Sequence, residues 1–179
     1  MNKAEIQQAL LENHARFIKH ISNLSDAEFL LSRNGKWTAG QQLEHIIKSV
    51  RPVRLALSLP AFLLRLIFGK ANRDSKSYEA LVEKYKQKLL AGGQASAPFI
   101  PRIVGIEDRK NLSAKLLALT NSLSNHISPF SEEQLDTHIL PHPLLGKLTL
   151  REMLYFTIYH VAHHENQVVQ NLASHRQPA

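Results

Sequence analysis

The amino-acid sequence predicts an all-α protein that folds as one helical bundle. Three observations support this fold class. Apolar residues recur at helical spacing in several long segments. Two of these segments begin at a capping-box pattern, Thr38 with Gln41 and Thr149 with Glu152. No internal repeat or low-complexity tract divides the chain, so we expect a single domain over residues 1–179.

The first two helices are predicted from periodicity and from local signals. Residues 3–24 place His14 and several apolar residues on one helical face, and a turn follows at Ser25 or Asp26. The second helix begins at the Thr38 capping box, with Trp37 positioned to pack against its entry. Pro52 predicts a kink or an end of this helix, because proline lacks the amide donor and collides with the preceding turn.

The middle of the chain is the least regular part. Residues 52–70 are the most apolar stretch, but Arg54, Pro60 and Arg65 interrupt it too often for a helix that spans a bilayer. We expect this stretch to pack in the core or at a dimer contact, with a peripheral membrane contact as the alternative. Residues 69–105 are rich in glycine and proline, which predicts a long connection with one short helix near Tyr78 to Leu90.

Two further helices complete the bundle. Asp108 can cap a third long helix that continues to about Ile127. Residues 137–148 contain two prolines and a glycine, and we expect an irregular loop there. The last helix begins after Thr149 and extends from Leu150 to about Ala173.

The composition restricts the class of protein and the kind of site. Hydrophobic residues make up 44% and charged residues 21%, values that exclude a disordered or fibrous protein. The chain has no cysteine, which excludes disulfides and thiolate metal sites and fits a reducing compartment. Any metal ion must therefore be held by nitrogen or oxygen atoms. The N-terminus lacks the apolar core of a secretory signal, so we expect a cytoplasmic protein.

The net charge of +7 favours anionic partners only in a general, screened way. Lys and Arg residues are scattered along the chain, and no aromatic residues lie between them as a base-stacking platform. A solvated basic surface is the preferred interpretation. Binding to nucleic acid or to a membrane surface ranks last among the functions considered.

Histidines in the last helix are the strongest candidates for chemistry. His160 and His164 are four residues apart, so both imidazoles can point from one helical face at a single position. A divalent ion such as zinc or nickel requires at least three protein ligands, and His45 in the second helix is the best third candidate. The sequence equally favours the alternative that these histidines bind no metal and only form ordinary hydrogen bonds.

The sequence gives weaker support for a role of other polar residues at this site. Gln167 shares the face of His160 and His164 and could orient a ligand, and Gln41 lies one turn before His45. His163 could carry protons near the metal, although ordinary packing is the preferred interpretation. The sequence identifies no catalytic base, because the side chains of Glu44 and Glu165 point away from the neighbouring histidines.

Two stretches of the chain resemble a known family. The sequence GKWTAGQQLEHI, together with HPLLGKLTLREMLYFTIYHVAHHENQV near the C-terminus, is similar to the DinB-like superfamily of metal-binding four-helix bundles. The resemblance implies helices that run up-down-down-up with a long crossover, and frequent homodimers. It also implies a three-histidine site for a divalent ion at His45, His160 and His164, followed by Gln167.

The family resemblance also implies the classes of function to consider. Members with a known activity include thiol-dependent S-transferases that use low-molecular-weight thiols, and hydrolases have been inferred for others. A metal-dependent transferase or hydrolase that acts on a small molecule is therefore the first expectation. A bundle whose metal site is purely structural is the alternative. Fold and ligands do not by themselves name a reaction.

Overall fold

The computed structural model describes residues 1–33 and 35–176. This part of the chain is mainly helical and has only one small two-stranded sheet, so the predicted all-α class is confirmed. The helices are α1 (Lys3–Asn23), α2 (Asp26–Leu30), α3 (Ala39–Leu57), α4 (Ala61–Phe68), α5 (Tyr78–Leu90), α6 (Arg109–Ile127), α7 (Glu132–Thr137) and α8 (Leu150–Arg176). The strands are β1 (Ile139–His142) and β2 (Gly146–Thr149), and two 3₁₀ turns are η1 (Ala97–Phe99) and η2 (Ile106–Asp108).

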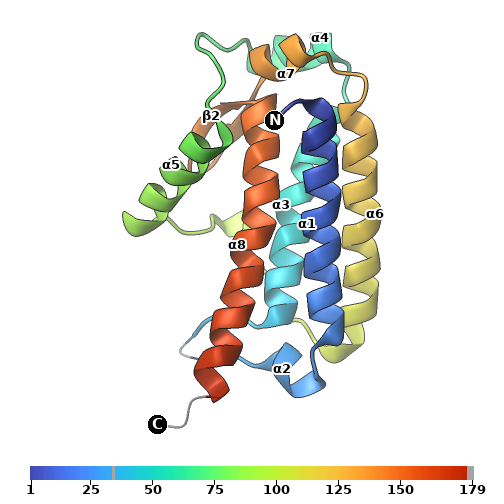
Figure 1. Cartoon of the computed structure of the whole chain (residues 1–179), viewed down its shortest axis with the longest axis vertical. Coiled ribbons are helices and arrows are strands. Elements are labelled where there is room, and N and C mark those ends of the chain that lie inside the picture. The colour runs from blue at the N-terminus through green and yellow to red at the C-terminus, as the bar shows by residue number, and fades with distance from the viewer. Residues whose placement is uncertain (34, 177–179) are drawn as a thin grey trace.

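Four long helices form the bundle. In Figure 1, α1 and α8 run down the page, whereas α3 and α6 run up. The helix α1 packs on α6 and α8, and α3 packs on the same two helices from the other side. Since α3 and α6 are parallel, the chain must return from the top of the bundle to the bottom between them. The α5 helix lies outside the bundle against α8 and belongs to this return (Figure 1).

Both predicted capping boxes form, and both lead into helices of the bundle. The Thr38 hydroxyl accepts from the Gln41 amide, while the Gln41 side-chain oxygen accepts from the Thr38 amide. Thr149 and Glu152 exchange the same two bonds at the start of α8. These reciprocal bonds satisfy backbone donors that have no partner within the helix. The helices therefore begin where the local sequence places them.

The apolar faces of the four long helices meet in one hydrophobic core. From α1 the core takes Ile6, Leu10, Phe17 and Ile21, all fully buried. His14 lies on the same face and is also buried. The long helices α3, α6 and α8 contribute residues such as Leu43, Leu116 and Leu154. This packing fixes the relative positions of α3 and α8, which carry the histidines.

Two details of the local predictions were wrong, and one of two alternatives at Pro52 is excluded. Of the kink or end predicted there, the end is excluded because α3 continues to Leu57. Pro52 lies on the exposed side of the helix, and Val53 is buried in the core. Asp108 does not cap α6 with its side chain; its carboxylate instead accepts from the Arg102 guanidinium.

Residues 137–148 do not form an irregular loop either. Residues 139–142 pair antiparallel with residues 146–149, and Gly146 adopts a φ of 79° at the turn. His142 Nδ1 closes the turn by accepting from the backbone amides of Leu144 and Leu145, at 3.1 and 3.0 Å. The prolines are tolerated because a two-stranded sheet has only edge strands. This hairpin brings His142 towards α8, where its ring contacts Phe156.

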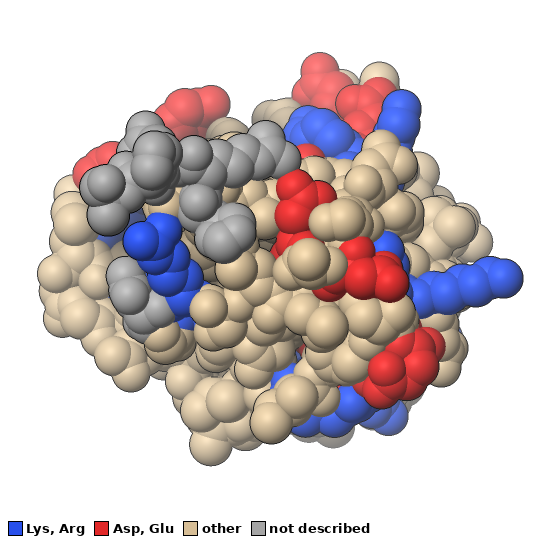
Figure 2. Space-filling view, turned by 90° about the horizontal axis from the view of Figure 1, so that it is seen from below, with Lys and Arg blue, Asp and Glu red and all other residues tan. Residues whose placement is uncertain are grey.

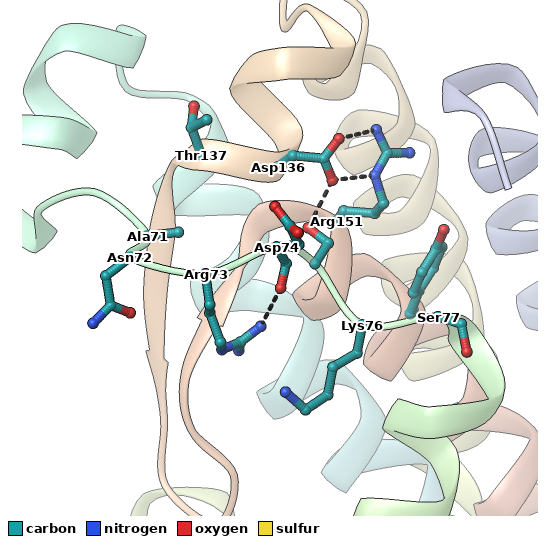
Figure 3. A pocket seen from close by; sticks show the side chains of 11 residues that line it. Ala71, Asn72, Arg73, Asp74, Lys76, Ser77, Asp136, Thr137 and Arg151 are labelled. Carbon is teal, nitrogen blue, oxygen red and sulfur yellow. Dashed lines mark hydrogen bonds and ion pairs between the residues drawn. The ribbon is translucent and has the colours of Figure 1, made fainter.

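The long connection is anchored to α8 by an ion pair. The Glu152 carboxylate is fully buried and accepts from both terminal nitrogens of Arg73, at 2.6 and 2.7 Å. Arg73 lines a cavity of about 700 Å³ near the top of the bundle, together with Asp136 and Arg151. Figure 3 shows the Arg151 guanidinium facing the Asp136 carboxylate. The Arg73–Glu152 pair thus ties the connection to the start of α8, and the Arg151–Asp136 pair ties α7 to the same place.

The lower end of the bundle carries both kinds of charge. Figure 2 shows Lys and Arg interspersed with Asp and Glu among uncharged residues on this end. No helix in the described part of the chain combines the length and the hydropathy needed to cross a bilayer.

Candidate metal centre

Three histidines from two helices meet inside the bundle. His45 lies on the inner face of α3, and His160 and His164 lie on the facing side of α8. Their side chains are buried, with exposed fractions of 4%, 6% and 5%. The spacing of four residues places the two rings of α8 on one face, as the helical repeat requires. The packing of α3 against α8 supplies the third ring.

The Nε2 atoms of the three rings converge. The Nε2 atom of His160 lies 3.3 Å from that of His45 and 2.9 Å from that of His164. One ligand atom from each ring can be chosen so that all three lie within 4.8 Å of one another. Two nitrogens bound to one tetrahedral zinc ion are separated by roughly 3.4 Å. The donor set and its spacing therefore fit a small divalent ion.

The other ring nitrogen is held by a carbonyl oxygen in two of the three histidines. His45 Nδ1 lies 2.7 Å from the backbone oxygen of Phe99, and His164 Nδ1 contacts the side-chain oxygen of Gln42. Carbonyl oxygens only accept, so each Nδ1 must carry the proton and donate it. The lone pair is then on Nε2, the atom that faces the other rings. Metal-binding histidines are commonly oriented in this way.

The environment keeps these imidazoles neutral. Burial lowers the pKa of His160 and of His164 well below the ordinary value, and the neighbouring histidines lower both further. Burial also lowers the pKa of His45, although its hydrogen bond to Phe99 opposes this shift. A neutral imidazole is the form that binds a metal ion. The site is therefore ready to act as a ligand set at neutral pH.

A chain of side-chain amides supports His164 from α3. Gln42 donates to Gln167 at 3.0 Å, and the Gln167 amide nitrogen lies 2.9 Å from His163 Nε2. Gln41, which the sequence placed near the site, instead uses its side-chain oxygen in the capping box. Sequence reasoning missed Gln42, whose signal was its position three residues before His45 on the same helical face.

A cavity of about 670 Å³ adjoins the three histidines. Its walls come from α3, α5, α8, the hairpin and the connection after α5, and it reaches the surface. Most of its lining is apolar, including Val53, Leu140 and Phe156, and Gln167 and His163 line it as well. The lining that the structure describes contains no lysine, arginine, aspartate or glutamate. A small molecule in this cavity would lie directly beside the histidines.

The two carboxylates next to the histidines in sequence are bound elsewhere. Glu44 accepts from the backbone amide of Arg102 at 2.6 Å, and Glu165 accepts from Arg16 at 2.9 Å. Neither lines the cavity. The sequence prediction that neither is a persuasive base agrees with this placement.

A comparison with models of protein families places this chain among known proteins. A family model described as the DinB superfamily matches residues 9–168, which is most of the 179-residue chain. No curated protein matches the chain. The matched region contains all three histidines of the cluster and both helices that carry them. Together with the bundle and the histidine cluster, this match shows that the chain belongs to the DinB superfamily.

Proposed function

We propose that this protein is a metal-dependent enzyme that acts on a small molecule at a divalent ion held by His45, His160 and His164. The single observation that carries the proposal is the convergence of three buried Nε2 atoms beside an accessible cavity. A structural metal site is commonly closed by four protein ligands, whereas a catalytic site keeps a position open for water or substrate. Here three histidines face a cavity large enough for a substrate.

The proposed ion and reaction class are supported by the ligand set and by the activities that the family resemblance implies. We propose zinc or nickel as the ion, because imidazole nitrogens suit both and the chain offers no thiolate. When bound, such an ion lowers the pKa of a water or thiol and so supplies a nucleophile at neutral pH. Thiol-dependent S-transfer, with a low-molecular-weight thiol, and hydrolysis are the two reactions proposed.

The chain's own residues have separate tasks in this proposal. Phe99 and Gln42 hold the rings of His45 and His164 in the orientation that presents Nε2. Gln167 links Gln42 to His163, which lines the cavity and can accept or release a proton beside the substrate. The apolar walls restrict water around the reacting groups. The homodimer and the cytoplasmic location remain predictions.

Elemental analysis of untagged protein tests the metal site. We expect one zinc or nickel ion per chain, its loss in His160→Ala, and its retention in the matched control His163→Ala. His163 is suited to this comparison because it lies on the same helix and lines the same cavity, but is not in the converging group. Retention of the ion by His160→Ala, with normal helical content, would refute the assignment of the ligands.

Activity assays test the catalytic part. Thiol-transfer and ester-hydrolysis assays are run on metal-loaded protein, on chelator-treated protein and on chelator-treated protein reloaded with metal. We expect turnover to disappear with the chelator and return with the ion while the circular dichroism spectrum is unchanged. A chelator that lowers only the melting temperature, with turnover absent throughout, would support a structural ion instead.

A further inference from the structure

The cavity beside the histidines contains polar groups that the proposed metal site does not use. Tyr85, on α5, lines the cavity and contacts His160 and Phe156 through its ring. No described residue forms a hydrogen bond with its hydroxyl. His142, on the hairpin, lines the cavity as well and contacts the same Phe156 ring. Two rings with polar edges therefore flank one aromatic side chain of α8.

The hydrogen bonds of the hairpin decide which nitrogen of His142 can donate. Its Nδ1 accepts from the backbone amides of Leu144 and Leu145, so it cannot carry a proton. The neutral ring must then be protonated at Nε2. No described group accepts from this Nε2–H. Tyr85 and His142, which both line the cavity, thus each have one donor without a partner among the described residues.

The rest of the cavity lining disfavours the binding of a charged ligand. The described lining has no lysine, arginine, aspartate or glutamate that could pair with an ionic ligand. Its walls are mainly aliphatic and aromatic side chains, contributed by five separate segments: Val53 and Ala56, Phe68, Leu89, Leu140 and Leu144, and Met153 and Phe156. Away from the three histidines, a charged group placed among these side chains would lose its hydration without gaining a partner. An uncharged molecule with an apolar body suffers no such loss.

We propose that the cavity binds an uncharged molecule that has an apolar body and a carbonyl oxygen. The apolar body lies against Phe156 and its aliphatic neighbours, and the oxygen accepts from Tyr85 or from His142 Nε2–H. This inference rests on the proposed function, since it names the substrate class for the same site. It makes Tyr85 and His142 positioning residues and makes the apolar walls the determinant of specificity.

Ligand binding tests the cavity without any assay of turnover. The full-length chain is titrated with the fluorescent apolar probe N-phenyl-1-naphthylamine, which we expect to bind saturably at one site per chain. Ala56→Trp places an indole in the cavity and should abolish saturable binding. The matched control Ala118→Trp is exposed on α6 and should bind as the wild type does. Ala95→Trp, in the connection after α5, blocks the same cavity if Ala56→Trp does not fold.

A pair of competitors tests the carbonyl. Displacement of the probe is measured with 4-phenyl-2-butanone and with butylbenzene, which lacks the oxygen. In Tyr85→Phe we expect the ketone to bind about fivefold more weakly, the effect of one net hydrogen bond. The affinity for butylbenzene should be unchanged. An equal loss for both competitors, or none for the ketone in both Tyr85→Phe and His142→Phe, would overturn the proposed donors.

The two proposals fail in different measurements. His160→Ala should lose the metal ion yet still bind the probe, because most of the cavity wall is intact. Absence of metal from the wild type, with the probe bound and displaced as described, refutes the metal enzyme alone. Metal retained at one ion per chain, with probe binding unaffected by Ala56→Trp and Ala95→Trp, refutes the substrate class alone.

Discussion

Gln42 offers the sharpest test of how the site is oriented. Its side chain is 2% exposed and bridges two groups of α8: it accepts from His164 and donates to Gln167. Gln42→Leu removes both bonds with little change in volume. The His164 ring then loses the acceptor that keeps its proton on Nδ1. We expect the affinity for zinc to fall as a consequence.

The expected loss of zinc affinity can be estimated from the role of residues that orient a metal ligand without binding the metal themselves. Loss of a group that orients a metal ligand typically weakens metal binding about 10- to 100-fold, which is about 1.4–2.7 kcal/mol. The neighbouring variant Gln41→Leu is the matched control, because Gln41 serves the capping box and not the histidines. It should lower the free energy of unfolding by about 1 kcal/mol and leave zinc affinity unchanged.

Zinc affinity is measured by competition with a chromophoric chelator, on variants whose helical content matches the wild type. Gln42→Glu serves as a second variant, since its carboxylate still accepts from His164 and should keep zinc binding close to that of the wild type. The reasoning is refuted if Gln42→Leu binds zinc as tightly as the wild type. It is refuted equally if Gln41→Leu weakens zinc binding to the same extent as Gln42→Leu.

Two further predictions concern stability. Burial lowers the pKa of His14 from 6.5 to about 4, so the unfolded chain takes up a proton there before the folded one does. The contribution of this pKa shift to the free energy of unfolding is fully present above pH 6.5 and is lost as the pH falls towards 4. Urea titrations should show that the resulting decrease in the free energy of unfolding is smaller by about 3 kcal/mol in His14→Leu than in the wild type. Arg73→Met leaves the Glu152 carboxylate buried without its ion pair and should cost about 3 kcal/mol at pH 7, measured in the same way.

Each stability prediction has its own control. For His14, the difference between wild type and variant should be constant above pH 7, and a difference that stays constant down to pH 4 contradicts the argument. For Arg73, the double variant Arg73→Met with Glu152→Gln should recover part of the loss, because the buried group is then uncharged. No recovery would indicate that packing of the arginine, and not its charge, matters.

Much of the fold could be predicted because its signals are local. The capping boxes at Thr38 and Thr149 are made by residues three apart, and the predicted helix at Tyr78–Leu90 matches α5. Predictions failed where a residue had competing partners. Asp108 carried a signal for a cap, but the Arg102 guanidinium holds its carboxylate. The hairpin of residues 139–149 was missed because its prolines resemble loop signals when the pairing is unknown.

The candidate site also has one part that the sequence determines and another part that only the tertiary packing decides. The helical repeat alone aligns His160 with His164, so the sequence by itself determined this pair and the face it occupies. Only the packing of α3 against α8 decided that His45 meets them, and only the return of the connection placed the Phe99 carbonyl against a ring 54 residues earlier.

The different partners of two adjacent glutamines show why tertiary packing decides part of the site. Both Gln41 and Gln42 lie within one turn of His45, but the capping box engages Gln41, and the neighbouring helix α8 presents His164 to Gln42. The local sequence determines which backbone groups need partners at a helix end. Which side chain faces another helix depends on the angle and register at which two distant apolar faces pack, and no short stretch of sequence contains that information.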